Sequence, residues 1–230
     1  LSLDVLSWLN TLNLGGTGTA LPQFIALLLT MFLAVVLGMG MPAVPAYINA
    51  ALLMSPVLAG LGLSLFTAHM FIFYFAVASA ITPPVALAAF AAASITKAEP
   101  MATGLSAVKS GIVIFIVPFV FAFHPELLLI NEAIIDAQSA SGGYLPGYDG
   151  QFAYGAFALL LMRLILALYL LSSALAAYDK SRLPPWEIMV RFTLAVLLMM
   201  KPETVWIGAA AVSLAVLFVH ARRPLDPIPE

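Results

Sequence analysis

The stretch VLGMGMPAVPAY (residues 36–47) places two glycines and two prolines within a long apolar segment. Glycine adopts backbone angles that other residues avoid, and proline removes an N–H donor from a helix. Gly38, Gly40, Pro42 and Pro45 therefore predict that one helix ends here and that the chain turns at a short tip. In lipid, irregular backbone persists only where it is buried in protein or lines a wet cavity. The tip therefore predicts either a packing kink or a binding site at membrane depth.

The composition indicates that the solvent of this chain is a bilayer. Of its 230 residues, 63% are hydrophobic and only 9% are charged, whereas a soluble domain has roughly 25% charged residues. The net charge of −2 and the absence of a long basic run argue against a nucleic-acid partner. With no cysteine, disulfides and thiolate metal sites are excluded. Nucleophile-elbow and zinc-protease motifs are absent, so we predict an all-α integral membrane protein that is not an enzyme and needs no cofactor.

A second break follows in the next apolar segment. Thr82-Pro83-Pro84 separates residues 63–81 from the alanine-rich run 85–95. Ser79 precedes Thr82 by three residues and shares its helical face. One break alone is typical of a packing kink, because Gly and Pro are frequent in membrane helices. Two breaks together favour a site in which carbonyl-rich helix ends hold Na⁺ and helix N-termini attract an anion.

The distribution of Lys and Arg predicts the orientation of the later segments. The polar loop 124–150 carries Glu126, Glu132, Asp136 and Asp149 without a basic residue, whereas 178–191 carries Lys180, Arg182 and Arg191. We therefore place 124–150 outside and 178–191 inside. Residues 152–178 form the clearest span, and 188–220 is either a helical hairpin or one kinked crossing.

Two side chains inside apolar segments need a partner. His69 either hydrogen-bonds within the bundle, which we favour, or carries a coupling proton. Arg163 is the one charge well inside a long span, where a charge is costly. We favour a structural pairing of Arg163, with Glu126 or Asp149, over a direct role in function.

The residues around the two breaks match a known family. The runs GMGMPAVPAYINAALLMSPVLAGLG (residues 38–62), HMFIFYFAVASAITPPVALAAFAAASI (69–95) and MATGLSAVKSGIVIFIVPFVFAFHPELLL (101–129) resemble the large membrane subunit of tripartite ATP-independent periplasmic (TRAP) transporters. The chain is more closely similar to the C-terminal part of the fused permeases that work with binding proteins of the TAXI type. The resemblance covers about residues 20–130.

This resemblance implies half of an elevator-type transporter, with a re-entrant hairpin and a discontinuous helix. The implied domains are a second-repeat transport region, the last helix of the permease core, an extracytoplasmic loop and extra C-terminal membrane helices; they span residues 1–97, 98–130, 131–150 and 151–230. Within the first, the hairpin would cover 21–62 and the broken helix 63–95.

The resemblance also implies a function. Such permeases import small carboxylates with Na⁺ as the coupling ion, across the inner membrane of bacteria or archaea, and receive substrate from a periplasmic solute-binding protein. The implied substrate and ion site comprises Gly38, Gly40, Pro42, Ala43, Ser79, Thr82, Pro83 and Pro84, with Na⁺ at Gly38, Gly40, Ser79 and Thr82. The implied partners are that binding protein, the N-terminal half and small-subunit helices missing from this chain, and membrane lipid.

One departure bears on the ion. Where relatives often carry two threonines after the tip proline, this chain has Ala43 and Val44. A cation there would rely on backbone carbonyls or on the hydroxyls of Ser79 and Thr82. Two alternatives therefore stay open: an ion- or proton-coupled exchanger on a related elevator scaffold, and a membrane assembly subunit that transports nothing.

Overall fold

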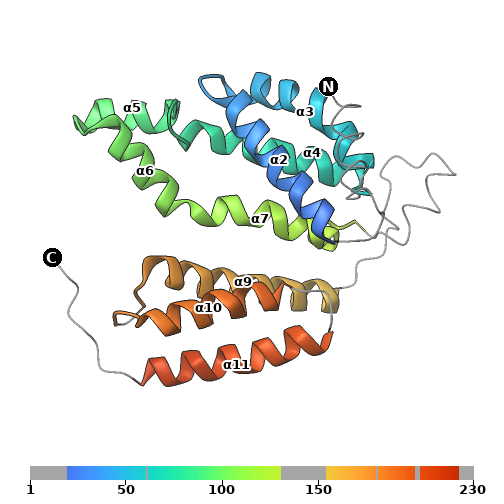
Figure 1. Ribbon diagram of the computed structural model, residues 1–230, viewed down its shortest axis with the longest axis vertical. Helices are drawn as coiled ribbons and strands as arrows, with labels where there is room; N and C mark the ends of the chain where they lie inside the picture. Colours follow the sequence, from blue (N-terminus) through green and yellow to red (C-terminus); the bar gives the residue numbers. More distant parts are fainter. Residues whose placement is uncertain (1–19, 61, 131–153, 180, 200–202, 223–230) are drawn as a thin grey trace, which may run out of the picture. The chain divides into compact units, whose positions relative to one another are not determined.

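The computed structural model describes residues 20–60, 62–130, 154–179, 181–199 and 203–222 (Figure 1). These residues form helices and short connections, with no strand among them. The chain divides into two compact units, Leu1–Gln151 and Phe152–Glu230, which are described separately. The predicted all-α fold is confirmed within the described residues. The calls on 1–19 and on the loop 131–150 lie outside them.

The first unit begins with a helical hairpin. Helix α2 (Ala20–Gly38) and helix α3 (Ala43–Gly60) pack against each other and are joined by residues 39–42. The chain breaks where the glycines and prolines predict it. Helix α3 continues through Pro56 in its interior, so only the clustered glycines and prolines end a helix here.

A broken helix follows the hairpin. Helix α4 (Leu65–Ala78) runs into the 3₁₀ turn η1 (Ser79–Ile81), and helix α5 (Leu87–Thr96) resumes after the prolines. Ser64 starts α4, because its hydroxyl accepts a hydrogen bond from the Thr67 backbone N–H at 3.1 Å. Helix α4 packs on both arms of the hairpin, which places the end of α4 beside the hairpin tip.

The last part of this unit is bent. Helix α6 (Pro100–Ser110) starts at Glu99, whose carboxylate accepts hydrogen bonds from the Met101 and Ala102 N–H groups. Helix α7 (Ile112–Phe123) follows at an angle of 43° across Gly111, and a short 3₁₀ turn η2 (Pro125–Leu128) ends the unit. The segment predicted as one last core helix is therefore two helices with a break at glycine.

Aromatic side chains form the centre of the core in the first unit. Phe71 and Phe75 of α4 are fully buried and contact each other, with ring centroids 4.9 Å apart. Both also meet Phe119 of α7, at 5.3 and 5.9 Å, and Phe119 contacts Phe24 of α2 at 5.7 Å. These edge-to-face and tilted contacts hold α4 between α2 and α7, so the broken helix is the central element of the unit.

The described residues of the second unit form three helices. They are α9 (Tyr154–Ala176), α10 (Pro185–Leu198) and α11 (Glu203–Ala221). Near the end of α11, His220 lies beside Glu187 at the start of α10, so these two helices run antiparallel. Residues 188–220 are therefore a hairpin of two helices, which resolves the alternative left open by the sequence.

Length and composition identify the candidates for crossing a membrane. Helices α3 and α9 are each long and apolar enough, and the bent pair α6 and α7 would be a third if it acts as one span. Many large apolar side chains are exposed, among them Leu52 of α3 and Met162 of α9. Because a bilayer rather than water suits such a surface, the described helices agree with a multi-pass membrane protein.

Candidate functional site

The hairpin tip is shaped by Gly40 and Pro42. Gly40 has a φ of +75°, in the left-handed region that glycine adopts without strain. Because Pro42 lacks an N–H, the carbonyl of Gly38 receives no α-helical hydrogen bond from that position. It accepts instead from the N–H of Met41 at 3.2 Å. The end of α2 is thus closed by one tight turn immediately before a proline.

The break after α4 is closed in the same way. The Ser79 carbonyl accepts a hydrogen bond from the Thr82 N–H at 3.1 Å, and Pro83 follows at once. The Ala80 carbonyl would need an N–H at residue 83 or 84, and both are prolines. This carbonyl is therefore excluded from the helical hydrogen-bond ladder at the end of η1 and is left for another partner.

The tip and the break touch each other. A methyl group built on Gly38 would lie 2.5 Å from Ser79 Oγ and 2.8 Å from Ser79 Cβ, so the two backbones are as close as glycine allows. Gly38 and Ser79 are both buried. Further along the tip, a methyl group on Gly40 would lie 3.4 Å from the Val85 side chain. The C-terminal end of α2 therefore meets the end of α4, where η1 begins.

The two hydroxyls at the break keep their acceptor capacity. Ser79 Oγ donates to the Ala76 carbonyl at 2.6 Å, and Thr82 Oγ1 donates to the Ala78 carbonyl at 2.8 Å. A hydroxyl that donates its hydrogen still has two lone pairs. Ser79 is fully buried and Thr82 is half-buried. The break therefore has one hydroxyl oxygen inside the protein and one closer to its surface.

Helix α6 covers another side of the break. A methyl group built on Gly104 would lie 3.0 Å from Pro83 Cγ, and one on Gly111 would lie 3.3 Å from Ile81 Cδ1. Close packing through these two glycines fixes the position of Pro83 against α6. The break is thus held between the hairpin and α6.

Of the eight predicted site residues, five lie at or next to the contact between the tip and the break, and three lie on its outer side. Gly38 and Ser79 are in direct contact, and Gly40 is close to the residue that follows Pro84. Thr82 joins them through its turn to Ser79, and Pro83 packs on α6. On the outer side of the tip, Pro42 is exposed and Ala43 half-buried, and Pro84 is exposed as well. Within the described part of the chain, no group of three His, Asp or Glu residues could hold a metal ion.

His69 is hydrogen-bonded on both ring nitrogens. Tyr47 Oη lies 2.7 Å from Nδ1 and Ser55 Oγ lies 3.0 Å from Nε2. Both hydroxyls belong to α3, whereas His69 belongs to α4. The ring therefore joins the second arm of the hairpin to the broken helix, which agrees with the favoured hydrogen-bonding interpretation.

Arg163 has partners within its own unit. Its side chain donates to the carbonyl of Leu198 at 3.1 Å from Nε and 2.8 Å from Nη2, and its guanidinium lies 4.5 Å from the centre of the Trp206 ring. The arginine thus caps the C-terminal end of α10 and stacks on α11. The last carbonyls of a helix attract a cation, so this position is a structural one, as the sequence favours; the predicted partner Asp149 lies outside the described residues.

Arg191 corrects one expectation from the sequence. The sequence placed it in a charged loop, but α10 begins at Pro185, and Arg191 is fully buried inside it. Its guanidinium lies 3.0 Å from both Asp179 and Glu187 and donates to Ser173 Oγ at 2.7 Å. The sequence signal for this network is the spacing of four between Glu187 and Arg191, typical of a helical ion pair. Arg191 therefore contributes no exposed charge to the orientation argument.

The connection between α9 and α10 places Asp179 beside this network. Burial raises the pKa of the Asp179 carboxyl group, but the hydrogen bonds from Arg191 and Tyr169 and the nearby positive charge together lower it by more. The net effect is a pKa below the ordinary value. His220 Nδ1 lies 2.9 Å from Glu187 Oε1, at ion-pair distance but without an aligned hydrogen bond. One polar network thus joins all three helices of the second unit.

The comparisons with known proteins give one result. A family model described as "Tripartite ATP-independent periplasmic transporter, DctM component" matches residues 4–134. Neither a curated protein nor a solved structure gives a match. The matched region covers more than half of the chain and includes both breaks and α6 and α7, whereas the three-helix unit lies outside it. The chain therefore belongs to the DctM family, the membrane permease component of TRAP transporters, which are transport proteins rather than enzymes.

Proposed function

We propose that this chain is the permease part of a Na⁺-coupled importer of small carboxylates and that the tip and the break form its ion and substrate site. The observation that carries the proposal is the contact between Gly38 and Ser79. It brings the C-terminal ends of two helices together inside a unit that belongs to a transporter family. Discontinuous helices bind coupling ions and substrates in this way in secondary transporters.

The cation side of the proposal rests on oxygen atoms. Helix C-termini carry a partial negative charge, and carbonyl and hydroxyl oxygens are the ligands that unwound helices offer to Na⁺. The Ala80 carbonyl cannot take part in the helical ladder. Ser79 Oγ and Thr82 Oγ1 retain lone pairs while they donate to backbone carbonyls. Ala43 and Val44 offer no hydroxyl at the tip, so we assign the Na⁺ ligands mainly to the break.

The proposed binding of a carboxylate substrate depends on two helix N-termini. Helix α3 begins at Ala43 just after Gly40, and helix α5 begins at Leu87 just after Val85. Gly40 and Val85 are neighbours, so two helix N-termini lie near one contact. A carboxylate is stabilised there by the partial positive charge of both helix ends. This arrangement supports a small carboxylate as substrate without a buried arginine.

The movement and the partners follow from the resemblance. The hairpin and the broken helix would shift together across the inner membrane of a bacterium or archaeon, as an elevator. The bridge from Tyr47 and Ser55 to His69 supports their moving as one body. A periplasmic binding protein of the TAXI type would deliver the substrate. The N-terminal repeat and the small-subunit helices would complete the permease, of which this chain is the C-terminal part.

The test is thermal unfolding of the purified protein in Na⁺ compared with K⁺ and choline. A ligand that binds only the folded state raises its stability by roughly 1.4 kcal/mol at ten times Kd. Thr82→Val should abolish the Na⁺-specific increase, because it removes a hydroxyl at the break. Thr193→Val is a matched control, since Thr193 donates to the Met189 carbonyl at 2.9 Å, as Thr82 does to Ala78, but belongs to α10 of the second unit.

Each alternative has its own outcome. An equal response to all cations, together with a shift of the unfolding temperature with pH, would favour a proton-coupled exchanger. No response to cations or pH would favour an assembly subunit whose breaks only pack. A Na⁺ response that survives Thr82→Val would keep Na⁺ coupling but remove Thr82 from the ion site.

A further inference from the structure

One end of the three-helix unit buries its acidic groups. This is the end where α9 ends, α10 begins and α11 ends, and its acids are Asp179 and Glu187. The side chain of Glu187 is 2% exposed and that of Asp179 15%, and both face the fully buried guanidinium of Arg191. Their negative charge is therefore directed into the protein. Among the described residues, the ionised groups exposed at this end are cations.

Two of these cations are arginines in defined positions. Arg182 lies in the turn between α9 and α10, which is fixed by backbone pairing of Tyr178 with Arg182 and by a 3.0 Å hydrogen bond from the Leu183 N–H to the Ala177 carbonyl. Arg222 follows α11, and its guanidinium stacks 4.3 Å from the centre of the Phe218 ring. Both arginines are exposed. Their guanidinium groups are thus presented at the surface by ordered backbone.

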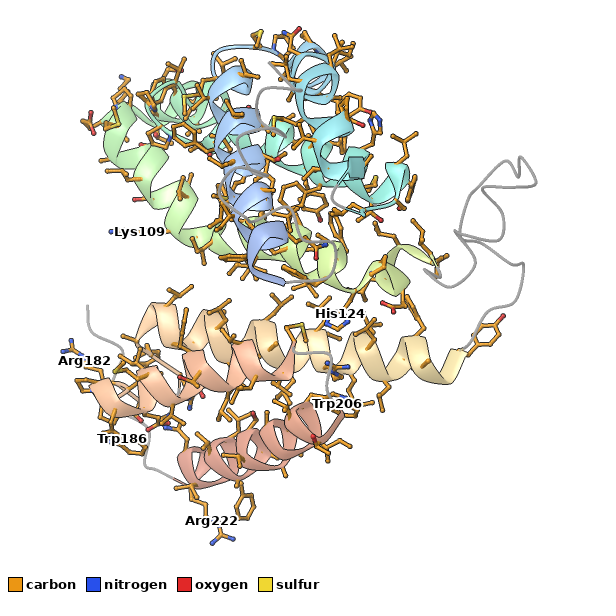
Figure 2. The ribbon with its side chains drawn as sticks, turned by 45° about the vertical axis from the view of Figure 1, so that its right-hand side comes forward. Lys109, His124, Arg182, Trp186, Trp206 and Arg222 are labelled. Atoms are coloured by element: carbon orange, nitrogen blue, oxygen red, sulfur yellow. The ribbon has the colours of Figure 1, made fainter. Side chains whose placement is uncertain are left out.

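An amphipathic aromatic residue lies at the same end. Trp186, in the first turn of α10, is 59% exposed. Figure 2 shows Arg182, Trp186 and Arg222 spread along the left-hand side of the unit, with Arg182 beside the turn before α10 and Arg222 near the end of α11. Tryptophan prefers the level of the lipid headgroups, and arginine forms paired hydrogen bonds with phosphate. We define these three residues as the basic end of the C-terminal unit.

We propose that the basic end binds the headgroups of anionic phospholipids. Its exposed charge is positive because Glu187 is buried and the half-buried Asp179 is paired with Arg191, and anionic phosphate is the complementary group. The exposed Trp186 and Phe218, with apolar helix surface next to them, favour a lipid over a soluble anion, since a lipid fills both the charged and the apolar part. Each surface arginine near an anionic membrane gives about a fivefold preference, so two give roughly twenty-five-fold.

The experiment measures which lipid lies beside Trp186. The full chain, with Trp8→Phe and Trp206→Phe so that Trp186 alone fluoresces, is reconstituted in vesicles of phosphatidylcholine and phosphatidylglycerol. Quenching by brominated phosphatidylglycerol is compared with quenching by brominated phosphatidylcholine. We expect a preference of at least fivefold for the anionic lipid. The ratio of quenching by the two lipids should fall close to one in the double variant Arg182→Gln/Arg222→Gln. The preference should persist in Lys109→Gln, which removes an exposed cation from the other unit.

A lysine double variant and competition with phosphate test the role of charge and the identity of the anion. Arg182→Lys with Arg222→Lys retains both charges and should keep most of the preference, which separates charge from folding. Equal quenching by the two lipids in the parent protein would overturn the proposal, as would an unchanged preference in the double glutamine variant. Loss of the preference on addition of millimolar inorganic phosphate at constant ionic strength would assign the basic end to a soluble anion instead.

Discussion

Gly38→Ala is the most direct perturbation of the contact between the tip and the break. The added methyl group would lie 2.5 Å from Ser79 Oγ and 2.8 Å from Ser79 Cβ. Rotation about χ1 moves Oγ away, at the expense of its 2.6 Å hydrogen bond to the Ala76 carbonyl. The same rotation leaves Cβ where it is. The end of α2 must therefore move away from η1 by several tenths of an ångström.

Extra methyl groups in a well-packed interior cost about 1–3 kcal/mol. We expect Gly38→Ala to lower the free energy of unfolding by that amount and to reduce Na⁺-dependent uptake far more, because the displacement lies within the proposed site. Unfolding is measured by sodium dodecyl sulfate titration in mixed micelles, and uptake in vesicles that contain the whole permease. Adding Ser79→Gly to Gly38→Ala removes both crowded atoms and should restore part of the stability. Normal stability and uptake in Gly38→Ala alone would refute the close approach.

Three further predictions test the tip and the buried network. Gly40→Ala and Gly62→Ala both force a residue with a Cβ into a positive φ, at about 1–2 kcal/mol each; both should lower stability in the micelle titration, but only Gly40→Ala should impair uptake. Arg191→Met should cost about 3–5 kcal/mol in the same titration, because it removes the buried guanidinium that faces both Asp179 and Glu187, whereas Arg191→Met with Glu187→Met should cost less. Burial raises the pKa of Asp179, but its hydrogen bonds and the nearby positive charge together lower it by more. The stabilising contribution of Asp179 is therefore complete above the unfolded pKa of 3.8 and disappears as pH falls through the lower folded pKa. Thermal unfolding between neutral and acidic pH should show this loss, and Asp179→Asn should remove it.

The positions of the breaks were predictable because their cause is local. Proline removes a donor and glycine permits a positive φ wherever the rest of the chain lies. The sequence accordingly places the ends of α2 and α4 within a few residues of where the structure has them. Which residues touch was not predictable in detail. The contact of Gly38 with Ser79 depends on how α4 packs on the hairpin, and that packing is set by aromatic residues from three helices.

The buried network shows the opposite case. A single arginine after a charged loop gives no local sign of burial, and only Glu187, four residues earlier, points to a helical pair. The remaining partners come from the preceding turn and from the far end of α11, at Asp179 and His220. Their meeting depends on the antiparallel arrangement of α10 and α11, which the sequence left open. Counting charges by segment therefore misplaced Arg191.

The two breaks follow one local rule, and this explains why small residues occupy their contact. At each break, the residue that would donate the α-helical hydrogen bond is a proline, and the N–H of the residue just before it donates instead. The Met41 N–H thus donates to the Gly38 carbonyl, and the Thr82 N–H donates to the Ser79 carbonyl. The resulting turn is tight, so the residue that bears the carbonyl lies at the very end of its helix. Two such ends approach closely only if those residues have minimal side chains, and here they are glycine and serine. A larger residue at either position would separate the carbonyl groups of both turns and would remove the concentration of oxygen atoms on which the proposed cation site depends.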